Sequence, residues 1–471
     1  MAYISRRGIL QGSAAIGFTS ATGLLGGMGR AYAADTSGYK ALVCLFLKGG
    51  MDSVDTILPT DVESHAALAE GRKDIFSSYR VGSGDSSRDR ENILGLSTER
   101  DFGGRSFGLP RELSPLHDLY TRGRMAVVGN VGPLVEPTTR DAMDKQTVEL
   151  PPRLFSHNDQ QSLWMSGGLE GKRFGWGGAF ADRVAPSNGL GLTFASVTAG
   201  PPEGFLNASR TKQYPGRLNG PVRLEVIDNI YRVGRNRDAA RARLAEHFAS
   251  TSATSDNVLR RDLAASNAVT QSNNAIFKEA IAGATEFTTA FPDTDIGKQL
   301  RTIAKIISIR GVLGANRQVF YAEKGGFDTH NDQTGNLPRR HREIAEAVVA
   351  FNAAMVELGL DESVTLFTGA DFGRTGLGNG NGTDHGWGGH QFVVGGAVKG
   401  GEIYGGIPAY DFGLQSYTRS RGRLIPDVSV DQYASTLGRW FGLADDEMAD
   451  ALPNLGNFAT KDLGFMGTGA S

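Results

Sequence analysis

Apolar residues dominate several short segments of the chain, and these segments predict strands that are buried on both faces of a sheet. The first is residues 41–47, where seven apolar residues follow one another as ALVCLFL. A strand that is covered on both faces loses the alternation of polar and apolar side chains, which is typical of parallel sheets. Four further apolar-rich runs have this character, at residues 125–131, 318–322, 364–368 and 391–396.

Between some of these runs, apolar residues recur at helical spacing. Residues 339–358 have this spacing, with apolar side chains at Ile344, Val348, Phe351, Met355 and Leu358. Residues 296–313 are similar. Strands that alternate with helices predict an α/β fold with a mainly parallel sheet. Residues 204–293 are richer in Arg, Ala, Asn and Ser, and they predict a helical insertion.

The N-terminus predicts an export signal. Residues 5–11, SRRGILQ, place two arginines before a mildly apolar stretch, which is the twin-arginine pattern. Residues 16–28 are too short and too polar to stay in a bilayer, and residues 31–33, AYA, form a small-x-small cleavage site. We therefore expect a twin-arginine signal peptide over residues 1–33 and a single mature domain over 34–471, periplasmic or secreted. The twin-arginine translocase would be its partner during export.

Charge and composition exclude some classes of function. The formal net charge of the 471 residues is −2 and no long basic run occurs, which argues against a nucleic-acid partner. No later apolar run reaches membrane-spanning length, so we expect no stable membrane span. The single cysteine, Cys44, lies in the first predicted strand and has no intrachain partner for a disulfide.

Acidic and histidine side chains follow or precede these predicted strands. In a parallel sheet the loops at the carboxyl ends of the strands meet at one edge, where α/β folds place their chemistry. Carboxylates and imidazoles together bind divalent cations, which polarise an ester oxygen during hydrolysis. An arginine nearby could hold a phosphate or sulfate group. The candidates in these loops are Asp52, Asp328, His330, Asp371, Arg374, Asp384, His385 and His390.

Each of these residues also has a structural interpretation, because an Asp at a strand end often caps a helix or closes a turn. The same alternative holds for Ser156, which precedes His157 at the start of a predicted helix toward Trp164. At that position the helix dipole and free N–H groups would favour an attacking alkoxide. A simple N-cap is the other interpretation, and both stay open.

Several motifs, in this order along the chain, resemble the bacterial family labelled domain of unknown function 1501. They are LFLKGGMD at 45–52, FSH at 155–157, GFDTH at 326–330, DFGRT at 371–375 and GTDHGWG at 382–388. The resemblance extends to LIP at 424–426 and YASTLGRWFG at 433–442, and so covers essentially the whole mature chain. Members of that family usually carry the same export signal.

That family resembles a branch of the alkaline phosphatase and sulfatase superfamily. The resemblance implies an alkaline-phosphatase-like α/β fold, with a large, mostly parallel sheet sandwiched by helices. It also implies one or two divalent ions at the strand ends and a hydroxyl nucleophile. By this resemblance the metal ligands are Asp52, Asp328, His330, Asp371 and either His385 or His390, while Ser156 stands where a nucleophile is expected.

The chain departs from the superfamily pattern at Phe372, where a histidine usually follows the later-strand Asp. Either that ion site is weakened, or Asp384 and His385 supply the pair. The second carboxylate ligand is thus open between Asp371 and Asp384. The Cys/Ser-x-Pro-x-Arg signature of sulfatases does not occur, which disfavours an ordinary arylsulfatase.

Two functions follow as hypotheses. The first is an exported metal-dependent hydrolase of phosphate or sulfate esters, acting on a small-molecule or polymer ester. Its divalent metal ion would be zinc, manganese, calcium or magnesium, and its catalytic residues Ser156, His157 and Arg374. The second is a non-catalytic cell-envelope protein for binding or assembly on the same fold, which the loss of the histidine at Phe372 suggests.

Overall fold

The structure of this chain is a computed structural model that describes residues 35–80, 86–171, 174–216 and 236–467. The predicted signal peptide at residues 1–33 lies outside the described residues. Within the described part, none of the helices is long and apolar enough to cross a membrane.

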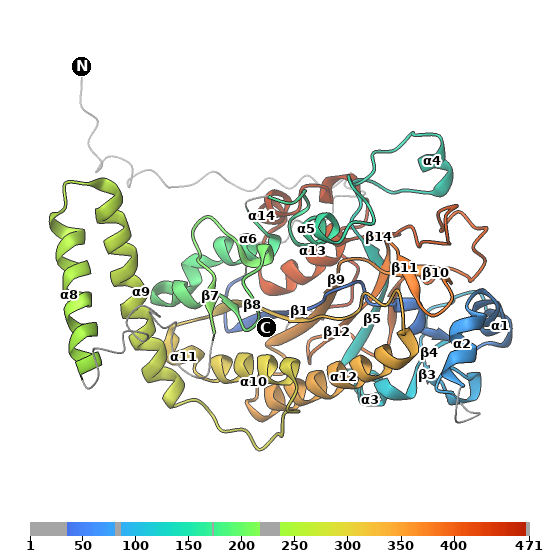
Figure 1. The fold of residues 1–471 in the computed structure, drawn as a ribbon, viewed down its shortest axis with the longest axis horizontal. Coiled ribbons are helices and arrows are strands. Elements are labelled where there is room, and N and C mark those ends of the chain that lie inside the picture. Colours follow the sequence, from blue (N-terminus) through green and yellow to red (C-terminus); the bar gives the residue numbers. More distant parts are fainter. Residues whose placement is uncertain (1–34, 81–85, 172–173, 217–235, 468–471) are drawn as a thin grey trace, which may run out of the picture.

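A nine-stranded sheet runs through the middle of the molecule (Figure 1). Its order is β13-β5-β12-β9-β1-β8-β6-β7, and β14 pairs with β5. Only β12 runs against its neighbours, while the other pairings are parallel. The strands are β1 (Lys40–Leu47), β5 (Met125–Gly132), β6 (Ser196–Thr198), β7 (Tyr214–Pro215), β8 (Arg317–Lys324), β9 (Val364–Ala370), β12 (Gly389–Val394), β13 (Ile403–Gly405) and β14 (Val428–Ser429).

All five apolar runs that the sequence predicts as strands lie in this sheet, as β1, β5, β8, β9 and β12. The predicted class, α/β with a mostly parallel sheet sandwiched by helices, is confirmed. Alternate side chains of β1 point to opposite faces and belong to different cores. Val43 and Leu45 lie in the core with α10, α12 and α3, whereas Cys44 and Phe46 lie in the core with α5, α6 and α13.

The helices form layers on both faces of this sheet (Figure 1). Those of the first layer are α3 (Ser114–Thr121), α10 (Asp295–Ser308) and α12 (Gln333–Glu357). Those of the second are α5 (His157–Ser166), α6 (Trp176–Arg183), α13 (Val430–Phe441) and α14 (Asp445–Ala451). The structure also has α1 (Val62–Gly71), α2 (Lys73–Tyr79), α4 (Arg140–Asp144) and α11 (Arg310–Leu313).

Two helix boundaries differ from the sequence prediction. The helix predicted over residues 339–358 begins at Gln333 in the structure, six residues earlier. Pro338 lies inside it, and a proline commonly marks a helix boundary because the residue before it avoids helical backbone angles. The helix predicted over 296–313 is divided into α10 and α11.

The range 204–293, predicted as a helical insertion, contains α8 (Arg237–Thr254) and α9 (Val258–Ala282). These two helices pack against each other at one end of the molecule (Figure 1). The same range also supplies β7, which pairs in parallel with β6 at the edge of the main sheet. Two small sheets complete the fold: β2 (Leu58–Pro59), β3 (Leu94–Leu96) and β4 (Phe107–Leu109) form one, and β10 (Arg374–Gly378) and β11 (Thr383–His385) form the other.

A close contact fixes α5 on the sheet. The buried ring of Trp164 in α5 lies over Gly369 of β9, where an added Cβ atom would come within 2.3 Å of the ring. Trp164 also packs edge-on against Phe46 of β1, with ring centroids 5.4 Å apart. Because α5 begins at His157, this packing sets where that histidine lies relative to the carboxyl ends of β1 and β9.

We expect Gly369→Ala to lower the free energy of unfolding by about 1–3 kcal/mol, because the new methyl group overpacks the contact with Trp164. The matched control is Gly311→Ala in α11, where an added Cβ meets open space. This change should be neutral or raise stability by about 0.4–1 kcal/mol. Urea denaturation of both variants measures the difference, and equal stabilities would contradict the packing assigned to Trp164.

Candidate metal centre at the carboxyl ends of the central strands

Three neighbouring parallel strands, β9, β1 and β8, end at the same edge of the sheet. Asp371 directly follows β9, Gly49 lies two residues after β1, and the loop after β8 carries Asp328 and His330. The loops that the sequence predicts to meet at this edge therefore do meet. Two further elements reach the same place, since α5 begins with His157 and β11 ends with His385.

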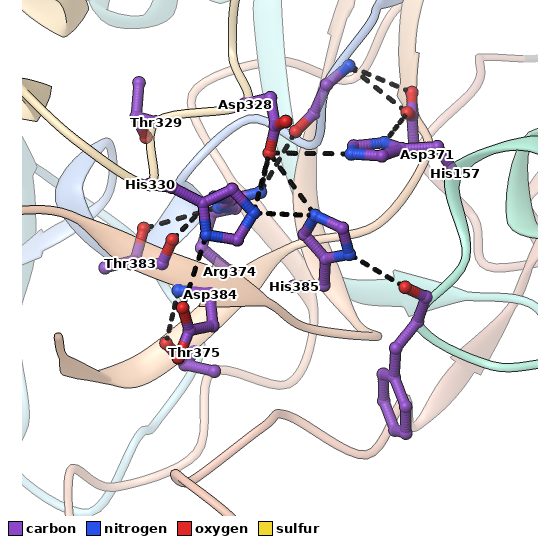
Figure 2. Close-up of polar contacts among 12 residues, drawn as sticks. His157, Asp328, Thr329, His330, Asp371, Arg374, Thr375, Thr383, Asp384 and His385 are labelled. Atoms are coloured by element: carbon purple, nitrogen blue, oxygen red, sulfur yellow. Dashed lines mark hydrogen bonds and ion pairs between the residues drawn. The ribbon is translucent and has the colours of Figure 1, made fainter.

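Three imidazole rings surround one carboxylate oxygen at this edge (Figure 2). The Oδ1 atom of Asp328 lies 3.2 Å from Nε2 of His330, 3.3 Å from Nε2 of His385 and 3.5 Å from Nε2 of His157. One ligand atom each from His157, Asp328 and His385 lies within 4.8 Å of the others. We call these four residues, His157, Asp328, His330 and His385, the His3Asp cluster.

The opposite nitrogen of each ring is held by a group that accepts hydrogen bonds. Nδ1 of His157 lies 2.6 Å from Asp371, and Nδ1 of His330 lies 3.3 Å from Asp384. Nδ1 of His385 donates to the main-chain carbonyl of Phe155 over 2.8 Å. Because ionised carboxylates and carbonyls only accept, each Nδ1 carries a proton, and each Nε2 faces the cluster, where it offers a lone pair when the ring is neutral.

This arrangement fits a divalent cation. Nε2 of His330 and Nε2 of His385 lie 2.9 Å apart, so in neutral rings two lone pairs face each other. Nε2 of His157 is buried and has no hydrogen-bond partner among the described residues. A positive charge shared by these nitrogens and by Asp328 removes the repulsion. Three imidazoles and a carboxylate suit zinc and similar metals better than calcium or magnesium, which prefer oxygen ligands.

The buried Arg374 at the start of β10 holds the carboxylate of the cluster in place. Its guanidinium donates to Asp328 over 2.9 Å, to the carbonyl of Gly49 over 3.2 Å and to the carbonyl of Thr383 over 2.6 Å. Burial acts to raise the pKa of Asp328, but the hydrogen bond and charge of Arg374, with His157 and His330, lower it below its ordinary value. Asp328 is thus held ionised, as a metal ligand must be.

The surroundings shift the pKa values of His157 and His385 in opposite directions. The hydrogen bond that His157 donates to Asp371 raises the pKa of His157 above its ordinary value, whereas burial lowers the pKa of His385. Asp371 is fully buried and also accepts hydrogen bonds from Gln161 and from the main-chain N–H of Gly49. Asp371 and Asp384 therefore both lie behind the cluster, where they orient His157 and His330, and the ligand atoms converge on Asp328 instead.

The sequence profile of the family described as "Protein of unknown function (DUF1501)" matches residues 39–448. The chain belongs to this family. A search of curated proteins gives no match to this DUF1501 chain.

Several solved structures are similar to the chain at low sequence identity. The PsFucS1 sulfatase from Pseudoalteromonas sp. has 12% identity and a TM-score of 0.35, over 92% of this chain and 73% of that chain. Ps i-CgsB has 8% identity and a TM-score of 0.35, over 90% and 77%. A second structure of Ps i-CgsB, in complex with k-i-k-neocarrahexaose, is similar to the same degree.

Besides Asp371 and Asp384, two more predicted ligands, Asp52 and His390, lie outside the His3Asp cluster. Asp52 is fully buried, and both of its carboxylate oxygens receive hydrogen bonds from Arg72, over 2.7 and 3.1 Å. His390 is buried in β12, where its Nδ1 accepts from the main-chain N–H of Asn130. Burial lowers the pKa of His390 to about 4, so its ring is neutral at pH 7.

Ser156 occupies the N-cap position of α5, next to His157, but its side chain makes no capping hydrogen bond. Within the part of the chain that the structure describes, the Ser156 hydroxyl has no hydrogen-bond partner. The preceding Phe155 has a backbone φ of +73°, which is uncommon for a residue with a side chain. This left-handed conformation accompanies the hydrogen bond between the Phe155 carbonyl and His385.

The sequence analysis missed one residue that connects the loops of the site. Gln333, the first residue of α12, is fully buried. Its Nε2 donates to Asp52 over 2.7 Å, and its Oε1 accepts from Thr329 over 3.1 Å and from Thr383 over 2.9 Å. Thr329 lies between Asp328 and His330, and Thr383 lies two residues before His385. The only signal in the sequence is that Gln333 follows this loop closely, which gives no hint of its partners.

We expect Asp52→Ala to lower the free energy of unfolding of the metal-free protein by about 3–5 kcal/mol, because it leaves the charge of Arg72 buried without its partner. The control is Asp118→Ala on the exposed side of α3, which should change stability by less than about 0.5 kcal/mol. Urea denaturation in the presence of a chelator measures both. Normal stability without metal, combined with weaker metal binding, would instead make Asp52 a ligand.

Proposed function

We propose that this protein is an exported metal-dependent hydrolase of phosphate or sulfate esters, with its metal held by the His3Asp cluster. The observation that carries the proposal is the 2.9 Å contact between Nε2 of His330 and Nε2 of His385. The Nδ1 atoms of both rings already form hydrogen bonds to other groups. Such a contact is repulsive between neutral rings and becomes favourable around a cation. Zinc or manganese fits these ligands best among the four candidate metals.

The position of the cluster supports a reaction with an external substrate. The side chain of Asp328 is 46% exposed and that of His330 is 38% exposed, so an ester can reach these residues from solvent. A bound divalent ion supplies the charge that stabilises the negative charge developing on an ester oxygen. The chain supplies the rest: Asp371 and Asp384 orient the rings, and Arg374 orients Asp328.

Ser156 is the proposed nucleophile, with a water as the alternative. Its hydroxyl stands at the first turn of α5, beside His157, and caps no N–H group of the helix. A serine that does not cap is free of the structural role that its position suggests. The N-terminus of α5 adds a positive potential that favours a developing anion there.

A different observation favours the second function, binding of a partner at the cell envelope. Five apolar side chains of α9 are exposed, and the most exposed, Leu259, reaches 81%. They are Val258, Leu259, Leu263, Val269 and Ile276. Apolar side chains that are exposed together along one helix can form an interaction surface. This surface lies on the α8–α9 pair and not at the cluster, so binding and hydrolysis are separable.

We expect the full chain, exported and purified without chelator or affinity tag, to contain about one equivalent of a divalent metal by elemental analysis. His330→Ala and His385→Ala should each lose it, because each removes a ligand. Asp371→Ala should retain binding at about 10–100-fold lower affinity, because Asp371 orients His157 and is not itself a ligand. The control His247→Ala, on the exposed face of α8, should bind as the parent does. Metal-free protein that gains no thermal stability from any added divalent ion would overturn the proposal.

Ser156→Ala tests the nucleophile. We expect hydrolysis of aryl phosphate or aryl sulfate esters to fall on the order of 1,000-fold or more in kcat. Metal content and thermal stability should stay the same, because no capping hydrogen bond is lost. Turnover that persists unchanged in this variant would assign the attack to a water.

A further inference from the structure

A short loop over β10 brings two more arginines to the cluster. The loop runs between Tyr417 and Leu424, which pair as an isolated antiparallel bridge. Main-chain hydrogen bonds dock it on β10, from Gly376 N–H to the carbonyl of Gly422 over 2.9 Å and from Leu377 N–H to the carbonyl of Arg421 over 3.3 Å. Arg421 has a φ of +56°, so the loop holds a strained residue in a fixed position.

Arg423 of this loop contacts His385 and also Phe155, whose carbonyl holds the His385 ring. Its Nε donates to the main-chain carbonyl of His385 over 2.7 Å. Its guanidinium lies over the ring of Phe155, with Cζ 4.3 Å from the ring centroid, and the carbonyl of Phe155 is the partner of His385 Nδ1. A third contact runs from Nη1 to the carbonyl of Ser420 over 3.2 Å. These contacts are all to neutral groups.

The three arginines near the cluster differ in whether they have a carboxylate partner. Arg374 pairs with Asp328, and Arg421 pairs with Asp384 over 3.0 Å. Arg423 has no carboxylate within ion-pair distance among the described residues, and it is half-buried. Burial, and also repulsion from the nearby Arg421, lower the pKa of Arg423 below its ordinary value, although Asp384 acts in the opposite direction. An arginine that is half-buried, rigidly held and without an anionic partner is well suited to bind an anion.

Arg423 does not reach the ligand atoms of the cluster itself. It holds the main chain of His385, whereas the metal-facing Nε2 is at the far end of the same side chain. An anion on Arg423 is therefore separate from the ester group that faces the cluster. Both groups can belong to one substrate, because the two positions are separated by only one residue's main chain and side chain.

We infer that Arg423 forms an anion subsite, and that the substrate is an ester that carries a second anionic group, a sulfate, phosphate or carboxylate, beside the group that is hydrolysed. This inference rests on the proposed function of the His3Asp cluster. The subsite selects substrates: esters with a single charge lack the group that Arg423 binds. The planar guanidinium offers its remaining N–H groups to the oxygens of this second group.

Stable sulfonates test the subsite without turnover. Methanesulfonate carries one anionic group, and propane-1,3-disulfonate carries two. We expect the disulfonate to bind the metal-loaded protein about tenfold more tightly by isothermal titration calorimetry, as one additional charge-assisted contact allows. In Arg423→Gln this advantage should disappear, and Arg423→Lys, which keeps the charge, should restore part of it.

The control is Arg419→Gln, in the same loop, whose side chain is 70% exposed and pairs with Asp144. Arg419→Gln should still bind the disulfonate more tightly than methanesulfonate, to the same degree as the parent does. Metal content is measured on every sample first. A parent protein that contains no metal would contradict the proposed hydrolase. Equal affinity of the metal-loaded parent for both sulfonates would contradict only the subsite. A loss of metal from Arg423→Gln alone would also overturn the subsite, because it would show that Arg423 acts by holding His385.

Discussion

The contact between Nε2 of His330 and Nε2 of His385 is the constraint on which the site depends. When both rings are neutral and carry their protons on Nδ1, two lone pairs face each other at 2.9 Å and repel, and a metal ion or a proton between them removes the repulsion. Hydrogen bonds to Asp384 and to the Phe155 carbonyl hold the opposite nitrogens of these rings and oppose their rotation. The chain thus maintains an arrangement that is unfavourable in neutral rings, and such an arrangement persists only when the surrounding structure determines it fully.

The surrounding structure does this with buried polar groups that are bonded to one another across loops. Gln333 joins Asp52, Thr329 and Thr383, which belong to three separate segments of the site. Arg374 joins Asp328 to the main chain after β1. Burying such groups is costly unless every member has its partners, and a fully satisfied network instead makes one arrangement unique. The sheet supplies the frame, because β9, β1 and β8 bring three of these loops to one edge.

The sequence predicts the frame better than the site. Long apolar runs such as residues 41–47 favour buried strands, and their carboxyl ends indicate the loops that can carry chemistry. Pairing within the site depends on contacts between distant residues, such as His157 and Asp371, which are 214 positions apart. No local pattern distinguishes Asp328, which meets three imidazoles, from Asp52, which meets Arg72. Each is an acidic residue after a strand, and only the three-dimensional structure shows that Asp328 faces imidazoles while Asp52 forms an ion pair.

Phe372 shows how the site differs from a two-ion arrangement. It directly follows Asp371, where the superfamily that the family resembles usually has a histidine. The centroid of its ring lies 4.7 Å from the ring centroids of both His157 and His385. An apolar ring there offers no ligand atom, but it covers one side of two rings and limits their rotation. With Asp371 engaged by His157, Gln161 and Gly49, the loop after β9 has no free donor for a second ion. For the metal proposed to bind the His3Asp cluster, this arrangement is consistent with one ion and with the ring of Phe372 as one wall of the site.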